Sequence, residues 1–461
     1  MTSLISRQRQ HNKSTDNKPT NSKVFTALLA VVFIMPWPHG GEVVWQYLLF
    51  STCIFSLAAI YFINNTNKKG NTFSALKSIK IPLTLLGMWL LFQVFQIIPL
   101  PIDLNKNNWQ TISIAPNVTL IELIKHTSYI TIFILTLLLL NTKQRILILA
   151  KTLFISSAII TFYSLIDFYS AGSISIIEPF PPWDFYSHDT IHGTFSYKNH
   201  FASFLLLTIP LGFGLVFINL STLQKKGGAL KTLNFFLSWN GLISVLTILM
   251  SITLVLNSSR AGNAALLVSF MCAMAYIVLI KRKKISWKKF ILSTITTLLL
   301  FFVILISGIS DNLISRYEND SDNGREQLRN TAISILKDHP ITGSGAGTFP
   351  VIHQQYKSSE LNSSIMWQRV HNDYLEMLGN QGVVGFSLLG SSILLLFMKL
   401  FRRFNTKNSP LFALQLACII STLAILIHSI VDFNFQLPVN AVYFYLILAI
   451  GIKIPTLKMK K

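Results

Sequence analysis

The chain has 461 residues, of which 51% are hydrophobic and only 12% are charged. An ordinary soluble domain has about 25% charged residues, so the composition excludes a set of water-soluble domains. The formal net charge of +21 would suit a nucleic-acid-binding protein. The basic residues, however, lie mainly in short gaps between apolar runs, where they act as topological determinants beside anionic lipid headgroups. We therefore expect membrane lipids, and no nucleic acid, as partners.

Apolar runs long enough to cross a bilayer recur along the chain, since a membrane helix needs about 20 mostly apolar residues. They predict an all-α polytopic integral membrane protein with about 12 transmembrane helices and one large, partly helical outer loop. The predicted spans are 24–38, 43–63, 81–100, 119–140, 146–169, 201–220, 235–256, 263–280, 290–309, 383–400, 411–430 and 438–453.

The distribution of Lys and Arg predicts the orientation of these spans. With the N-terminus inside, most of the 39 Lys and Arg residues fall into inner segments, as the positive-inside rule requires. No small-residue cleavage site follows the first span, which indicates a retained signal anchor. The predicted division is a basic cytoplasmic tail at 1–23, transmembrane helices at 24–309 and 383–453, a large outer loop at 310–382 and a second cytoplasmic tail at 454–461.

The cysteines and the glycines indicate no cofactor site. Cys53, Cys272 and Cys418 each lie within an apolar run, without the spacing of metal ligands or of a disulfide framework. The glycine-rich segment 343–347 follows a helix stop and not a strand, so we interpret it as a tight turn rather than a nucleotide-binding loop. With no zinc, calcium or Walker motif recognised elsewhere, we expect no cofactor.

The outer loop contains a predicted helix over 325–338, which begins after Asp322-Asn323-Gly324 and stops at Asp338-His339-Pro340. A helical wheel places Arg325 and Arg329, one turn apart, in its apolar sector. An inward-facing arginine needs an anionic partner, because its charge is not removed by deprotonation. That partner is either a substrate or a carboxylate such as Asp432 or Glu376, unless the stem packs while the head reaches solvent. The predicted apolar face consists of Leu328, Ala332, Ile333, Ile335 and Leu336.

A second predicted helix starts at the end of the same loop, with His371 at the centre of its apolar face. A histidine that points inward at a helix start is a candidate proton carrier, although a lone inward histidine is more often a packing residue. The apolar neighbours on this face are Tyr374, Leu375 and Leu378. The residues predicted to face away are Asn372, Asp373, Glu376 and Asn380.

Other polar residues gather at the predicted outer ends of the spans. Arg260 is the only charge between the seventh and eighth spans, Lys198 and His200 enter the sixth, and His428 and Asp432 join the last two. Lys198 and His200 suit either an anionic ligand or an interfacial anchor, and Arg260 suits a position in the headgroup layer. Within the fourth span, the spacing of Glu122 and Lys125 predicts a pair on one helical face.

Four stretches of the chain, taken together and in this order, resemble the O-antigen ligase and polymerase superfamily of bacterial envelope glycosyltransferases. They are 193–202, Ser259-Arg260-Ala261-Gly262, the run from Gly324-Arg325 to Gly343-Ser344-Gly345, and His371-Asn372-Asp373-Tyr374-Leu375-Glu376 through Gly382. The stretch from His428 to Pro438 is similar to a C-terminal signature of one large branch of this superfamily.

The resemblance implies an enzyme of the bacterial inner membrane whose active site lies at the outer face. The implied donor is a glycan on undecaprenyl pyrophosphate, and the acceptor is the lipid A core, a growing glycan chain or a protein hydroxyl. His371 matches the loop histidine proposed as general base, and Arg260 and Arg325 match arginines proposed to hold the pyrophosphate. Arg329 occupies a position where relatives often have an aromatic residue, and we group it with the pyrophosphate ligands.

Residue chemistry agrees with this expectation. Arginine forks stabilise the charge of a pyrophosphate leaving group without a metal, and an inward histidine serves as the base for an attacking hydroxyl. Two other classes stay open at this point. A secondary transporter or flippase would carry more charges at mid-span and some repeat symmetry, and a non-catalytic assembly partner would have no activity when purified.

Overall fold

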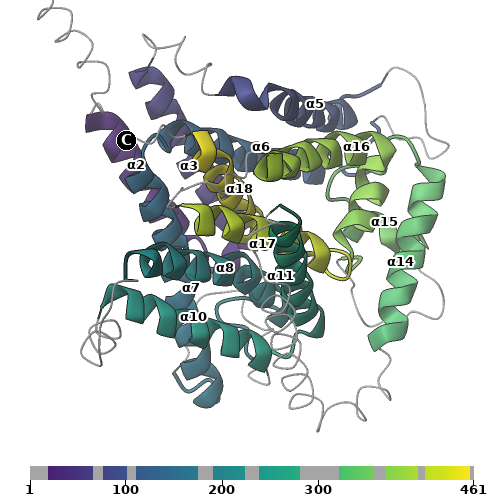
Figure 1. Ribbon diagram of the computed structural model, residues 1–461. Coiled ribbons are helices and arrows are strands. Elements are labelled where there is room, and N and C mark those ends of the chain that lie inside the picture. The colour runs from purple at the N-terminus through teal and green to yellow at the C-terminus, as the bar shows by residue number, and fades with distance from the viewer. Residues whose placement is uncertain are drawn as a thin grey trace, which may run out of the picture.

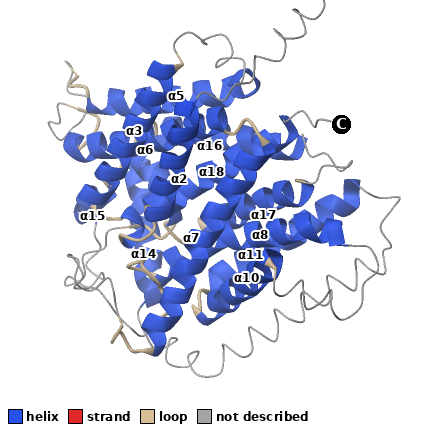
Figure 2. Ribbon diagram, turned by 90° about the vertical axis from the view of Figure 1, so that its left-hand side faces the viewer, coloured by secondary structure: helices blue, strands red, loops and turns tan. Residues whose placement is uncertain are grey.

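The structure is a computed structural model that describes residues 19–65, 76–100, 111–174, 190–223, 238–280, 321–356, 369–402 and 411–456. These residues form helices joined by turns, without a β-strand among them (Figures 1 and 2). The helices are α2 (Pro19–Ile34), α3 (Val44–Asn64), α5 (Lys80–Ile97), α6 (Pro116–Leu139), α7 (Lys143–Tyr169), α8 (Lys198–Leu223), α10 (Trp239–Leu256), α11 (Arg260–Ile280), α14 (Ser321–Asp338), α15 (Phe349–Tyr356), α16 (Asp373–Arg402), α17 (Phe412–His428) and α18 (Pro438–Lys453).

The predicted all-α architecture is confirmed for the described residues, but the count of 12 spans is not. Eleven of the predicted spans coincide with helices, and the span predicted at 290–309 lies outside the described residues. Nine of the described helices are long and apolar enough to cross a membrane, whereas the apolar parts of α2 and α17 are shorter. The chain is therefore a multi-pass membrane protein.

Helices α8 and α18 form the centre of the bundle, and each buries 83% of its most apolar stretch inside the protein. Helix α17 packs closely on α8, because Gly214 presents no side chain and a Cβ there would lie 2.9 Å from that of Ala417. Small residues let membrane helices approach in this way. The apolar core thus fixes the ends of α8, α17 and α18 relative to one another.

Polar contacts join the helix ends in two separate groups. Ends predicted inside bond to one another, as in Asn65 Nδ2 to Asn21 Oδ1 at 2.9 Å and Arg145 Nη2 to Ser22 Oγ at 3.2 Å. Ends predicted outside do the same, as in Gln96 Nε2 to the Thr342 carbonyl at 2.8 Å. In Figure 1 the start of α2 and the end of α18 lie toward the left, and α14 and α15 lie at the right. The described helices therefore alternate in direction as the sequence predicted.

Helix α16 changes direction at Gly382, which has φ +60° and ψ −170°. A side chain there would collide with the carbonyl of Ile341, because the turn that follows α14 packs directly on α16 at this point. Val383 N–H donates to the Pro340 carbonyl at 2.9 Å. The part of α16 after Gly382 coincides with the span predicted at 383–400, and the preceding turns pack against the turn that follows α14.

Candidate active site

Two loops meet at the outer end of the bundle, one before α16 and one between α17 and α18. The Asp373 N–H donates to the carbonyls of Ser429 and Asp432, at 3.1 and 3.2 Å. The Phe435 N–H donates to Asp373 Oδ2 at 3.1 Å. Asn372 caps the start of α16, since its side-chain oxygen accepts hydrogen bonds from the N–H groups of Tyr374 and Leu375. The backbone on both sides of position 372 is thus tied to the α17–α18 loop.

His371 directly precedes this cap and has a left-handed backbone conformation, with φ +54°. A non-glycine residue seldom adopts such a conformation, which costs of order 1–3 kcal/mol and concentrates at functional sites. The result is that the His371 ring turns toward Asp432, with Nδ1 at 3.4 Å from Oδ1. Its ring also packs edge-on against Phe433, with centroids 4.7 Å apart.

Asp432 is buried, with 1% of its surface exposed. Burial would raise the pKa of this carboxyl, but the interaction with His371 and the neighbouring His200 and His428 outweigh it and lower the pKa to about 2. Asp432 is therefore a carboxylate at neutral pH. Asn199 Nδ2 donates to its Oδ2 at 2.5 Å. A carboxylate held beside Nδ1 orients an imidazole and stabilises the imidazolium that forms when Nε2 takes a proton.

Arg325 reaches the same site from α14. Its Nη2 donates to the Tyr197 hydroxyl at 3.0 Å, and Tyr197 lies edge-on to His371 with ring centroids 6.1 Å apart. Asn199 Nδ2 also donates to the Tyr197 hydroxyl, at 2.9 Å. Tyr197 thus connects the predicted pyrophosphate-binding arginine to the predicted base, which are 46 positions apart in the sequence.

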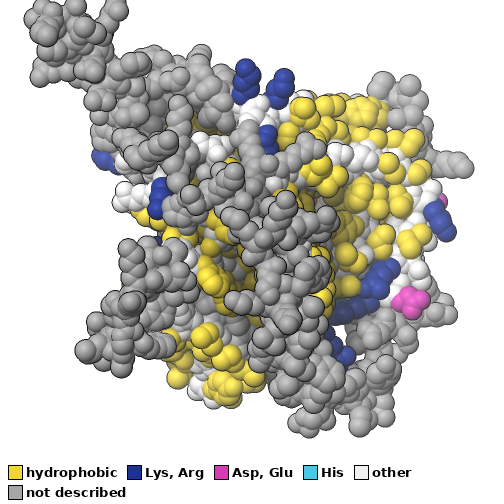
Figure 3. All heavy atoms as spheres, in the orientation of Figure 1, with side chains coloured by type: hydrophobic (Ala, Val, Ile, Leu, Met, Phe, Trp, Pro, Cys, Tyr) yellow, Lys and Arg dark blue, Asp and Glu magenta, His cyan; other side chains and the backbone are white. Residues whose placement is uncertain are grey.

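Arg329 and Arg260 are the other two predicted pyrophosphate ligands. Arg329 is half-buried, and its Nε has no hydrogen-bond partner among the described residues. Arg260 is exposed at the first position of α11. Figure 3 shows Lys and Arg side chains gathered at the lower right of the drawn face, where α11 and α14 lie in Figure 1. Both arginines therefore belong to elements that border the site.

The beginnings of α8 and α11 pack together at this end of the bundle. Asn257 Nδ2, just before α11, donates to the Lys198 carbonyl at 2.9 Å. A Cβ on Gly262 would lie 3.2 Å from that of Ala202. Arg260 and Lys198 are thus located at the starts of neighbouring helices. Lys198 directly follows Tyr197 in the sequence.

His200 and His428 lie deeper than His371. The His200 ring packs edge-on against Phe433 at 4.6 Å, and neither of its nitrogens has a hydrogen-bond partner among the described residues. His428 is fully buried, with Nδ1 at 2.8 Å from Ser203 Oγ. The Ser203 hydroxyl donates to Asn434, so His428 Nδ1 is the donor toward Ser203. We assign His428 to support of the loop beneath Asp432.

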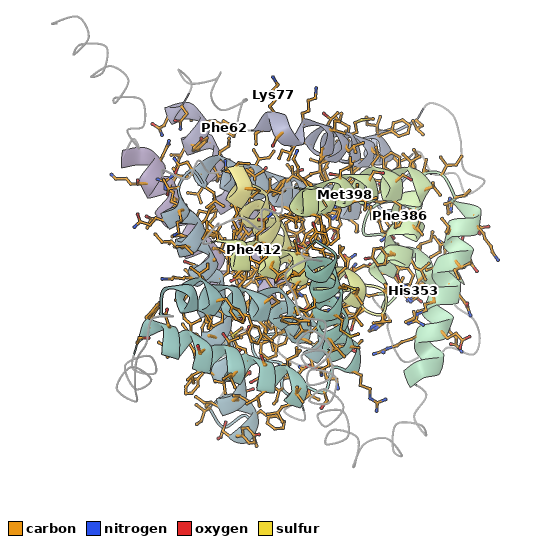
Figure 4. All side chains as sticks on the ribbon, in the orientation of Figure 1. Phe62, Lys77, His353, Phe386, Met398 and Phe412 are labelled. Carbon is orange, nitrogen blue, oxygen red and sulfur yellow. The ribbon has the colours of Figure 1, made fainter. Side chains whose placement is uncertain are left out.

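A large apolar cavity of about 360 Å³ lies beside the site, between α5, α6, α16, α17 and α18. Apolar side chains line most of it, and Phe386 of α16, labelled in Figure 4, is one of them. Glu122, Asp373 and Gln436 line its polar part. The cavity therefore runs from an apolar region to the loops that carry His371 and Asp432.

Residues 245–390 match a family model described as O-Antigen ligase. This match supports the predicted assignment to the O-antigen ligase and polymerase superfamily. The matched segment contains Arg260, Arg325, Arg329 and His371. No curated protein matches the chain. The enzymes of this family are of glycosyltransferase type, and they act on lipid-linked glycans with polysaccharide or lipid A acceptors.

The structure also reveals two ion pairs near the site. Arg369 Nη1 lies 2.9 Å from Glu376 Oε1, and Glu376 Oε2 accepts from the Val370 N–H at 3.0 Å. The Coulombic attraction of Glu376 and Glu122 outweighs burial and raises the pKa of Arg369. In α6, Lys125 Nζ lies 2.5 Å from Glu122 Oε1, which confirms the predicted pair.

The partner of Arg325 predicted on structural grounds differs from the one observed. Glu376 pairs with Arg369, and Asp432 accepts from Asn199 and lies beside His371. Arg325 donates to the Tyr197 hydroxyl instead. Neither Arg369 nor Tyr197 was singled out from the sequence. The available signals were the position of Arg369 two residues before His371, and a carboxylate at 376 that needs a cation once it is buried.

The helical wheels were only partly correct. On α14, Leu328, Ala332 and Ile335 are buried as predicted, but Ile333 is 38% exposed and Thr331 is buried. On α16, Asp373, Glu376 and Asn380 were predicted to face away, yet all three are buried. The reason is that the start of α16 is covered on several sides, by the α17–α18 loop, by Arg369 and by α5. His371 itself precedes the helix, and its inward placement is confirmed.

The segment 343–347 forms the predicted tight turn. Gly343, Gly345 and Gly347 all have positive φ, and a side chain on each would collide with α16, Ser113 and Glu122 respectively. The Ser344 and Gly345 N–H groups donate to the carbonyls of Gly379 and Asn380, at 3.0 and 2.8 Å. This turn therefore wedges between α6 and α16, where it holds the helix start that carries the site.

Proposed function

We propose that this protein transfers a glycan from an undecaprenyl-pyrophosphate donor to a hydroxyl of an acceptor at the outer face of the bacterial inner membrane. The acceptor is the lipid A core or a growing polysaccharide chain, and less readily a protein. The observation that supports this proposal is the arrangement of Arg325, Tyr197, His371 and Asp432, in which a histidine with a carboxylate neighbour and an arginine both contact Tyr197. It agrees with the family match.

In the proposed reaction, His371 Nε2 accepts the proton of the attacking hydroxyl while Asp432 stabilises the resulting imidazolium. The hydroxyl oxygen bonds to the anomeric carbon of the donor, and the bond from that carbon to the phosphate oxygen breaks. The lipid pyrophosphate leaves with the bond electrons. Arg325, Arg329 and Arg260 stabilise its charge through charge-assisted hydrogen bonds, and no metal is needed.

We also propose that both termini are cytoplasmic and that the loop 310–382 is periplasmic. The charge distribution of the spans supports this orientation. It places α14 and the start of α16 on the side where a lipid-linked glycan is exposed after export. The apolar cavity would then lie at the depth of the acyl region, next to the site.

The test is a transfer assay with the purified protein in liposomes. We expect a covalent product from a lipid-pyrophosphate-linked glycan and an acceptor, and we expect it to persist in EDTA. Movement of the donor across the bilayer without a covalent product would favour a flippase, and neither result would favour an assembly partner. The surface glycan of a deletion strain separates the subclasses. Loss of all capped lipopolysaccharide indicates a ligase, single-repeat caps indicate an O-antigen polymerase, and a lost capsule indicates another polymerase.

A further inference from the structure

A second, smaller cavity of about 130 Å³ lies directly behind the candidate active site. Phe433 borders both, because its ring contacts His371, at 4.7 Å, and His200, at 4.6 Å between centroids. His200, Lys125 and Arg369 line the cavity from three different parts of the chain, and the exposed Glu42 stands at its edge. The arginines of α14 and α11 do not line it.

The charges around this cavity are already balanced. Lys125 is paired with Glu122, and Arg369 is paired with Glu376. Glu42 accepts a hydrogen bond from the Ser196 hydroxyl and adds a further carboxylate. A diphosphate placed here would meet carboxylates and cations that are no longer available. The cavity therefore suits an uncharged ligand that forms many hydrogen bonds.

His200 is the group that indicates a ligand. Its side chain is 1% exposed, it lines the cavity, and neither Nδ1 nor Nε2 has a hydrogen-bond partner among the described residues. A buried polar group without a partner costs about 1–3 kcal/mol, so such groups need an explanation. A neutral imidazole has one donor and one acceptor nitrogen. Hydroxyl groups, which both donate and accept, match it on either side.

The size of the cavity and its aromatic walls agree with a sugar. An apolar cavity of about 150 Å³ holds a molecule the size of benzene, so 130 Å³ corresponds to roughly one six-membered ring. Tyr47 and Phe433 supply flat aromatic surfaces among the polar groups. Small-molecule sites commonly combine aromatic walls with a few placed polar groups in this way.

We propose that this cavity binds the terminal sugar ring of a glycan acceptor, and that His200 hydrogen-bonds its hydroxyl groups while another hydroxyl is presented to His371. The inference rests on the proposed function, in which His371 is the base. It assigns the two substrates to different sides of His371. The donor pyrophosphate lies on the arginine side, and the acceptor sugar lies on the side of the balanced charges. His200 is a binding residue and takes no proton.

The decisive variant is His200→Phe, which keeps an aromatic ring against Tyr197 and Phe433 but removes both nitrogens. In the liposome assay we expect the KM for the acceptor to rise about tenfold or more, as the loss of one or two hydrogen bonds implies. The KM for the donor should stay within about twofold. His353→Gln is the control, because His353 lies in α15 (Figure 4) and does not line the cavity, so the substitution should leave both constants unchanged.

Acceptor binding without donor makes the result independent of turnover. Saturation-transfer NMR with a short acceptor oligosaccharide should show contact with the wild-type protein and loss of contact with His200→Phe. Should His200→Phe fail to fold, Glu42→Gln at the exposed edge provides the same comparison. The proposal is overturned if the folded variant binds the acceptor as well as the wild type does, or if donor binding is weakened instead. It is also overturned if the wild-type protein binds a serine peptide in place of the glycan. If the glycan binds through His200 but no transfer occurs, the proposed function fails and this site stands.

Discussion

In the candidate site, the backbone is strained at His371, whose ring has to be oriented toward Asp432. His371 has φ +54°, which glycine or asparagine would adopt at lower cost, but neither of them carries a base. The hydrogen bonds of Asn372 and Asp373 hold the backbone in place on its C-terminal side. The strained backbone thus turns the His371 imidazole toward Asp432. Removing this imidazole should lower the rate of transfer more than it weakens donor binding.

We expect His371→Gln to lower the rate of transfer by a factor on the order of 10²–10⁴, which is the usual contribution of a general base. Glutamine retains a hydrogen-bonding side chain but does not take a proton at neutral pH. Donor binding should survive, because His371 is assigned to the acceptor hydroxyl and not to the pyrophosphate. Single-turnover rates and donor affinity, measured on the same folded preparation, check this. Near-normal turnover in a well-folded His371→Gln protein rules out the base role.

Arg325 should contribute through its fork and not only through its charge. Arg325→Lys keeps a cation but loses the planar pair of donors, one of which bonds to Tyr197. We expect donor affinity and turnover to fall about tenfold or more, and further in Arg325→Ala. Lys337→Ala, an exposed basic position at the end of the same helix, is the control and should change neither. If Arg325→Ala inserts normally and retains donor affinity and turnover, the assignment is wrong.

At the scale of the element, α16 joins the loop to the membrane through a break. The turns before Gly382 carry the buried Glu376 and Asn380, and the turns after it form the apolar span. Ile341 and the glycine turn pack into the break, so the loop after α14 and the start of α16 form one unit. The position of Asp373, and through it of His371, depends on this packing.

Gly382→Ala should therefore destabilise the protein. Alanine is disfavoured at φ +60°, and its Cβ would collide with the Ile341 carbonyl, so a cost of about 1–3 kcal/mol or more is expected. Gly390→Ala is the matched control on the same helix, since a Cβ there meets no atom within 4 Å. That variant should be neutral or slightly stabilising. Melting temperatures in detergent decide, and equal melting temperatures for the two variants would contradict the packing described here.

At the scale of the whole molecule, the bundle brings together residues that are far apart in the sequence. Tyr197, Arg325, His371 and Asp432 come from the start of α8, from α14, from the start of α16 and from the α17–α18 loop. The two cavities meet at Glu122 and Gln436, which line both of them. An apolar space and a polar one are thus adjacent at the same end, as an enzyme acting on an amphipathic, lipid-linked glycan requires.

The proposed orientation makes a simple labelling prediction. In a background without Cys53, Cys272 and Cys418, single cysteines at Lys337 on α14 and at Lys77 before α5 should respond differently to an impermeant thiol reagent. Both positions are exposed, and Lys77 is labelled in Figure 4. In intact spheroplasts, Lys337→Cys should react and Lys77→Cys should not, whereas both should react after lysis. Equal labelling of the two in intact cells would refute the topology.

The membrane class, the approximate ends of the described helices and several candidate site residues could be predicted from the sequence. Hydrophobicity and helix propensity are local properties, so the apolar helices, the stop before Pro340 and the apolar segment that begins at 383 were predictable. The motifs around His371 and Arg325 were recognisable because the residues that carry the chemistry lie within short segments. The predicted span at 290–309 lies outside the described residues, so the count of 12 stays a prediction.

Which of the candidate site residues contact one another could be seen only in the tertiary structure. The pairs Arg369–Glu376 and His371–Asp432, and the bond from Arg325 to Tyr197, depend on how α8, α14, α16 and the α17–α18 loop pack. A helical wheel assumes that one face of the helix is exposed to solvent. This assumption failed at Glu376 and Asn380, because several elements cover the start of α16. The cavity at His200 was equally invisible, since its walls come from five separate parts of the chain. Burial in membrane proteins is decided by packing among helices, which hydrophobicity alone does not encode.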